Sequence, residues 1–241
     1  MGLYLRLALV IILLLAIPVG CGSQGTEQQS AVDRAIAKAG QVQSYRSDGN
    51  STIIDESGEV MSASFTTEVA APDRFYSKTI GDQMWLEAVK DGDRCYFREG
   101  EGESWRSCEE EIGQDNQTLE DVEMPMAGAI ALLAYMKDIK ELDQEDVDGV
   151  TCRRYRGEID TSSYIRALAE ATGETPPAED ELAAWKIDVN VWIDEDDYVR
   201  KMDIDTLIPS MVAGQGEISM RSSTRFYDFG AAIEIVLPQV Q

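Results

Sequence analysis

The sequence has 241 residues and is strongly acidic, with 45 Asp and Glu against 21 Lys and Arg and a formal net charge of −24 at pH 7. A charge of this sign repels nucleic acid, so we expect no nucleic-acid partner. The chain contains no histidine, which excludes Ser-His-Asp and Cys-His nucleophile pairs, histidine metal sites and imidazole pH switches. Hydrolases that use pairs of carboxylates are the main enzyme class left.

The N-terminal segment indicates an exported protein. Arg6 precedes an uncharged apolar run over 7–17, which is too short to span a membrane and is typical of a secretory signal peptide. The stretch from Ile17 to Cys21 resembles the lipobox of bacterial lipoproteins, although Pro18 departs from its pattern. The resemblance implies cleavage before Cys21 and diacylation of that cysteine. An ordinary signal peptide with a cysteine near its cleavage site is the alternative.

The remainder of the chain reads as one anchored domain. We expect residues 1–20 to be the lipoprotein signal peptide and residues 21–29, which are polar and poor in bulky groups, to form a flexible tether. Residues 30–241 are expected to form a single domain, because all-β folds often reach this size undivided. The anchor on Cys21 would hold this domain on the outer face of the cytoplasmic membrane or the periplasmic face of a membrane.

Three cysteines follow Cys21, and in an oxidising compartment two of them are expected to pair. Cys95 and Cys108 flank a glycine-containing turn over residues 99–104, and a hairpin centred on that turn would place them opposite each other. We therefore predict a Cys95–Cys108 disulfide and a buried free thiol at Cys152. The alternative is that all three are reduced packing residues.

The spacing of apolar residues predicts the remaining elements in chain order. Residues 30–43 have the period of an amphipathic helix, and residues 45–108 have the period of two that predicts about six antiparallel strands. Residues 124–136 carry no charge, which predicts a buried helix that emerges into solvent at Lys137. The remaining predictions are a strand over 150–160, a helix over 162–172 and strands over 185–193, 198–206 and 217–228. Each strand has one polar and one apolar face, so the helices are expected to cover one side of the sheet.

The order of these elements resembles the LolA-like lipoprotein fold, which includes the LppX and LprG lipoproteins of mycobacteria. Three short motifs add to the resemblance: the turn Pro72-Asp73-Arg74, the pair Asp148-Gly149-Val150 and Tyr155, and the strand Val191-Trp192-Ile193-Asp194 followed by Val199-Arg200-Lys201-Met202. The resemblance implies an α+β fold in which a strongly curved antiparallel sheet, a half-barrel, has helices covering its concave face. A hydrophobic cavity between them would hold acyl chains.

The resemblance also implies a function. We expect a membrane-anchored envelope lipoprotein that binds a lipid, lipopeptide or other acyl-chain ligand for carriage or transfer, without catalysis, cofactor or metal, and with an envelope transporter or sensor protein as a candidate partner. The residues expected to line the cavity are Met61, Phe65, Met124, Met126, Ile130, Leu133, Met136, Ile187, Val189, Val191, Met202 and Ile204.

Other interpretations of the same residues stay open. The apolar residues of 124–136 could simply fill the core under the sheet. A non-catalytic, RseB-like envelope sensor or interaction module is the alternative function. A carboxylate-based hydrolase would need acids inside an apolar cleft, whereas the acids here lie in turns and on polar strand faces. An EF-hand-like calcium loop over 144–155 fails, because Gln144 and Tyr155 stand at its first and twelfth ligand places.

Overall fold

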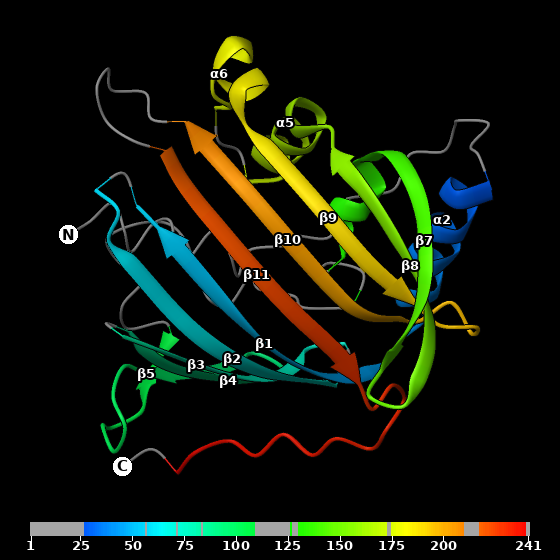
Figure 1. Cartoon of the computed structure of the whole chain (residues 1–241). Coiled ribbons are helices and arrows are strands. Elements are labelled where there is room, and N and C mark those ends of the chain that lie inside the picture. The colour runs from blue at the N-terminus through cyan, green and yellow to red at the C-terminus, as the bar shows by residue number, and fades with distance from the viewer. Residues whose placement is uncertain are drawn as a thin grey trace.

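The computed structural model describes residues 27–55, 57–70, 72–82, 84–108, 126, 130–172, 175–209 and 217–239. Within these residues, eleven strands form one antiparallel sheet in the order β6-β5-β4-β3-β2-β1-β11-β10-β9-β8-β7. Figure 1 shows that the sheet is strongly curled and open. This is the α+β half-barrel that the sequence predicted.

The sheet consists of two meanders that meet at its centre. The first meander contains β1 (Ser44–Ile54), β2 (Val60–Ala70), β3 (Arg74–Gly81), β4 (Trp85–Asp91), β5 (Arg94–Arg98) and β6 (Arg106–Ser107). The second contains β7 (Met136–Val147), β8 (Val150–Ile159), β9 (Lys186–Ile193), β10 (Val199–Pro209) and β11 (Glu217–Tyr227). The first and last strands, β1 and β11, pair over nine residues from Arg46↔Tyr227 to Ile54↔Ser219. The pairing of the first and last strands therefore joins the two meanders at the centre of the sheet.

Helical segments accompany the sheet in the described part of the chain. They are α2 (Glu27–Ala39), the 3-10 helix η2 (Ala131–Tyr135), α5 (Thr161–Thr172) and α6 (Glu179–Ala184). The apolar stripe of α2, which the spacing of 30–43 predicted, is buried at Ala31, Val32, Ala35, Ile36 and Ala39. This stripe belongs to the same core as Leu133 of η2. Burial of each Val, Ile or Leu side chain in this core contributes about 1.5–3 kcal/mol.

The structure corrects two expectations and adds one helix. The first helix begins at Glu27, inside the stretch that we expected to be the tether. The predicted helix over 124–136 is wrong at its C-terminal end, because residues 131–135 form a 3-10 helix and Met136 already begins β7; Met124 lies outside the described residues. The sequence also gave no sign of α6.

The charged stretch after Met136 is an edge strand rather than the solvent-exposed end of a helix. Almost all of β7 is exposed, so its sequence has no apolar alternation. Its pairing with β8 is also irregular, with register shifts between Lys137 and Lys140 and between Glu141 and Gln144. Charges and bulges are the usual protection of an edge strand against pairing with another chain.

The predicted cysteine pairing is confirmed. Cys95 and Cys108 form a disulfide whose Cα atoms are 5.4 Å apart, and Cys152 is a buried free thiol. Burial raises the pKa of the Cys152 thiol to about 11, so this sulfur is protonated and unreactive at neutral pH.

Candidate functional site

The concave face of the five central strands carries no charge. Residues paired across an antiparallel sheet point to the same side and alternate along each strand. Tyr45 of β1 is 1% exposed in the core, and the registers of β1, β2, β9, β10 and β11 identify the residues on its side. These are Tyr45, Ser47, Gly49, Ser51, Ile53, Met61, Ala63, Phe65, Thr67, Val69, Ile187, Val189, Val191, Ile193, Met202, Ile204, Thr206, Ile208, Ile218, Met220, Ser222, Thr224 and Phe226. Although the chain has a net charge of −24, none of these positions is Asp, Glu, Lys or Arg.

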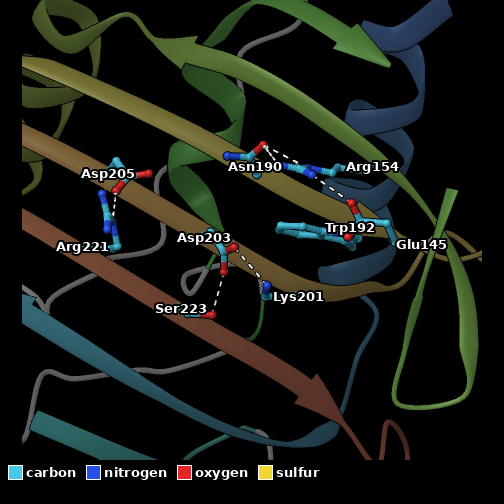
Figure 2. A network of polar contacts seen from close by, with 9 residues as sticks. All are labelled: Glu145, Arg154, Asn190, Trp192, Lys201, Asp203, Asp205, Arg221 and Ser223. Atoms are coloured by element: carbon cyan, nitrogen blue, oxygen red, sulfur yellow. Dashed lines mark hydrogen bonds and ion pairs between the residues drawn. The ribbon is translucent and has the colours of Figure 1, made fainter. Parts of the chain in front are cut away.

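The opposite, convex face carries the charges of the same strands. Arg46 pairs with Glu68 at 2.9 Å, and Arg225 pairs with Asp48 at 2.6 Å. Figure 2 shows part of this network on β9, β10 and β11, including Lys201 beside Asp203 at 3.0 Å. Each such pair on an exposed surface contributes little to stability. Their main effect is to keep this face of the sheet solvated.

Trp192 is a large buried side chain on the convex face. Its indole is 2% exposed and its Nε1 donates a hydrogen bond to Glu145 at 2.9 Å. The Arg154 guanidinium and the Lys201 ammonium lie 5.0 and 4.2 Å from its ring, as Figure 2 shows. The hydrogen bond from Trp192, together with that from Arg154, lowers the pKa of Glu145. With Val147 and Cys152, Trp192 forms a small second core beneath the β7–β8 hairpin.

The concave face is tightly packed at the end where α2 and η2 cover it. Val189 and Val191 of β9 are 0% exposed, as are Ile130 and Leu133 beside η2. Burial also raises the pKa of the Tyr45 hydroxyl. Of the residues predicted to line a cavity, those in this core are Met126, Ile130, Leu133, Met136, Ile187, Val189, Val191 and Met202, with Ile204 packed against it.

The far end of the face is less filled. Met61 and Phe65 of β2 are only half-buried, as are Ile53 and Met220 beside them. Phe65 lies flat over β1, because a Cβ added at Gly49 would be 2.5 Å from the Phe65 Cζ atom and 2.3 Å from the Ser223 carbonyl oxygen. Glycine at position 49 therefore lets the Phe65 ring lie directly against β1.

Between these two ends, the side chains are small and many carry a hydroxyl. Ser47 and Ser51 of β1 are 6% and 8% exposed, and Thr67 of β2 is 7% exposed. Ser51 lies between Ala63 and Ser222 in the registers of the neighbouring strands. We call Ser47, Ser51, Thr67, Thr79, Thr206, Ser222 and Thr224 the hydroxyl band. All of these side chains are small, whereas Val189, Val191 and Leu133 fill the closed end.

Two solved structures have the same architecture. LprF from Mycobacterium bovis aligns over 90% of this chain and 99% of its own, at 14% identity with a TM-score of 0.51. Lipoprotein LppX from Mycobacterium tuberculosis aligns over 88% of this chain and 100% of its own, at 15% identity with a TM-score of 0.52. The chain has the LppX fold. No protein-family model and no curated protein match the sequence.

The LppX fold explains which site residues sequence reasoning missed. Large apolar side chains are recognisable in the sequence, and those predicted for the site mostly pack against the helices. The small residues in the middle of the half-barrel alternate with polar neighbours on β1 and β11, so no apolar pattern marks them. A run of Ser, Thr and Gly on alternate positions of a long strand, such as 47, 49 and 51, is the signal that could have found them.

An open groove of about 670 Å³ lies elsewhere in this LppX fold, at the outer edge of the sheet. It lies between the start of α2 and β7 and is lined by Gln28, Glu141, Leu142, Asp143, Glu145 and Arg154. Its charged lining does not suit an alkyl chain. Over the described ranges, no group of three His, Cys, Asp or Glu side chains is placed to hold a metal ion. The described helices are each too short or too polar to cross a membrane.

Proposed function

We propose that the protein binds a lipid or another acyl-chain ligand on the concave face of its half-barrel and carries or transfers it in the cell envelope. The absence of charge from the concave side of β1, β2, β9, β10 and β11 carries this proposal. Removing an alkyl chain from water onto such a surface gains about 0.8 kcal/mol per methylene group, and no buried ion opposes it.

The small side chains of the hydroxyl band support room for a ligand. A core built only for stability would be expected to fill the middle of the sheet with large aliphatic residues, as the closed end does with Val189, Val191 and Leu133. Here Ser51, Ala63 and Ser222 meet at the centre instead. The half-buried Met61 and Phe65 then form an apolar surface between that centre and solvent.

We further propose that acylated Cys21 anchors the domain. Five residues separate Cys21 from Glu27, where α2 begins, so the folded domain would be held close to the membrane surface. LppX, whose fold the chain shares, is itself a lipoprotein, which supports this anchor. Replacement of Cys21 by Ser should move the protein from the membrane fraction to the soluble fraction. Retention of the variant in washed membranes would contradict the anchor.

Native mass spectrometry tests the lipid-binding proposal. Protein released gently from its membrane should carry an extra mass that dissociates on collisional activation and is identified as an acyl lipid. After removal of that lipid, the protein should take up a pyrene-labelled diacylglycerol at a ratio of about one to one. A protein without bound lipid that also fails to take up the probe would contradict lipid carriage and favour the non-catalytic sensor or interaction module.

A further inference from the structure

The C-terminal segment after β11 has the side-chain pattern of a strand but lies outside the sheet. Figure 1 shows this segment extended and running beneath the first meander. Its side chains alternate in exposure from residue 232 to 237, with Ile233 at 7% and Val236 at 72%. Such alternation is the geometry of a β-strand that has one face against the protein and one in water. We call residues 232–237 the free strand.

The backbone of the free strand is unpaired. In the part of the chain that the structure describes, no hydrogen bond joins the backbone of residues 232–239 to any other residue. The free strand therefore offers N–H and C=O groups along both of its edges. A row of such groups is a template on which a strand of another chain can pair.

The start of the free strand is fixed to the sheet. The Ser44 hydroxyl donates a hydrogen bond to the Ala231 carbonyl at 2.6 Å, and the Gly230 N–H donates one to the Ser44 carbonyl at 2.9 Å. The Phe229 ring stacks on Tyr198 with 4.5 Å between the ring centroids. A strand that is already held in an extended form loses little conformational freedom when a partner pairs with it.

The two edges of the sheet itself are protected against such pairing, whereas the free strand is not. At one edge, β6 is only two residues long, and at the other, β7 is charged and its register is irregular. Short length, charges and bulges are the usual protections of an edge. Residues 229–239 carry one ionisable side chain, Glu234. Pro238 has no N–H, so it ends the ladder after residue 237.

Glu234 indicates the charge of the partner. Its side chain is exposed and makes no ion pair with another residue of the described ranges. In a pair of strands the residues that stand opposite each other interact, and opposite charges stabilise the pair. The net charge of −24 also attracts a basic partner and repels a second copy of the chain. Ala232 and Val236, which are exposed beside Glu234, suit apolar residues opposite them.

We propose that the free strand is a docking site for an extended segment of a basic partner protein, which pairs with it as an added β-strand. The partner segment has Lys or Arg opposite Glu234 and apolar residues opposite Ala232 and Val236. Main-chain hydrogen bonds provide the affinity, and the alternate side chains provide the selectivity. The interaction is separate from the proposed lipid binding, because the free strand lies outside the concave face.

Fluorescence anisotropy of the full chain with three labelled peptides tests this docking site. The first peptide is Thr-Val-Thr-Lys-Thr-Val-Thr, which places Lys between two Val residues on one face in either strand direction. The second has Glu in place of Lys. The third has the sequence of the first with every backbone nitrogen methylated, so it keeps the charge but cannot donate hydrogen bonds to a ladder. The wild-type chain should bind the first peptide about tenfold or more tightly than the other two.

Two matched double variants separate the backbone from the side chains. Ile235→Pro with Val236→Pro removes one N–H from each edge of the free strand, and Ile235→Ala with Val236→Ala keeps both. The proline pair should bind the Lys peptide about tenfold less tightly than the alanine pair. Glu234→Lys should reverse the preference, so that the Glu peptide binds more tightly than the Lys peptide. Circular dichroism verifies that each variant folds.

Each other outcome overturns a stated part of the proposal. No binding of the Lys peptide, or equal binding of its methylated form, would exclude strand pairing and leave only attraction to an acidic surface. Equal affinities of the proline and alanine pairs would place the peptide elsewhere on the molecule. An unchanged preference in Glu234→Lys would contradict the basic partner. Sedimentation of the wild type should show a monomer, and a dimer that the proline pair abolishes would assign the free strand to a second copy instead.

Discussion

The closed end and the middle of the concave face both lack charge, yet they are built from different side chains. At the closed end, Val191 of β9 and Leu133 of η2 are 0% exposed and belong to one packed core. In the middle, Ser51 of β1 and Ser222 of β11 stand opposite each other and present only small side chains. One uncharged surface can therefore serve two purposes. Its large residues stabilise the fold, and its small residues leave space for the proposed ligand.

Truncation at the closed end should have the largest effect on stability. Leu133→Ala removes three carbons from a fully buried side chain and should lower the free energy of unfolding by about 2–5 kcal/mol. Urea denaturation at 25 °C measures the loss. Diacylglycerol affinity of the folded protein should change little, and a loss of binding larger than the loss of stability would break the division between the two regions.

Removal of the disulfide should have the next largest effect. Cys95 and Cys108 belong to the packed core, and their sequence separation is 13. Replacement of both by Ala should lower the free energy of unfolding by about 3 kcal/mol, because the unfolded chain gains entropy. Chemical denaturation of the oxidised wild type and the double variant measures the difference. Equal stability of the two would show that the edge formed by β5 and β6 adds nothing to the core.

On the convex face, a change should affect stability slightly and binding not at all. Trp192→Phe removes the hydrogen bond that Nε1 donates to Glu145 and should cost about 1 kcal/mol. The measurement is the midpoint of urea unfolding alongside a diacylglycerol titration. If this variant lost ligand affinity, the ligand-binding surface would extend beyond the concave side.

The smallest effect should be a pH dependence of the stability lost in Trp192→Phe. The Trp192 hydrogen bond holds the pKa of Glu145 below its usual value, so the stabilisation is present near neutral pH and is lost as the pH falls through the lowered pKa. The stability difference between wild type and Trp192→Phe should therefore narrow from pH 7 to pH 3. Because Glu145 is partly exposed, the change should stay below about 1 kcal/mol. A difference that widened in acid would reverse the sign of this linkage.

Much of the fold could be predicted because most strands have one wet and one dry face. In β2, Met61, Ala63 and Phe65 alternate with exposed neighbours, and the period of two is plain in the sequence. β7 escaped prediction because an edge strand that is exposed on both sides has no such period. The short 3-10 helix escaped because an uncharged segment can be buried in several conformations, and Met136 turns into a strand only through its pairing with Ile159.

The site could be predicted less well, because it depends on which residues the paired strands place side by side. Large apolar residues such as Val189 and Met202 are recognisable from sequence, and they form the packed end of the face. The middle of the face depends on Ser51, Ala63 and Ser222 lying side by side, although Ser222 comes from a strand that is far from the other two in the chain. No local pattern reports that pairing, so the hydroxyl band emerges only when the sheet is assembled.

The most direct test of the account places one bulky side chain on either face of β2. Ala63 points into the concave side and Ser64, its neighbour, is exposed on the convex side. A titration of the full chain with pyrene-labelled diacylglycerol compares Ala63→Trp with Ser64→Trp, both verified as folded by circular dichroism. Ala63→Trp should lose about tenfold or more in affinity, and Ser64→Trp should bind like the wild type. Unchanged binding by Ala63→Trp would contradict a ligand site on the concave face.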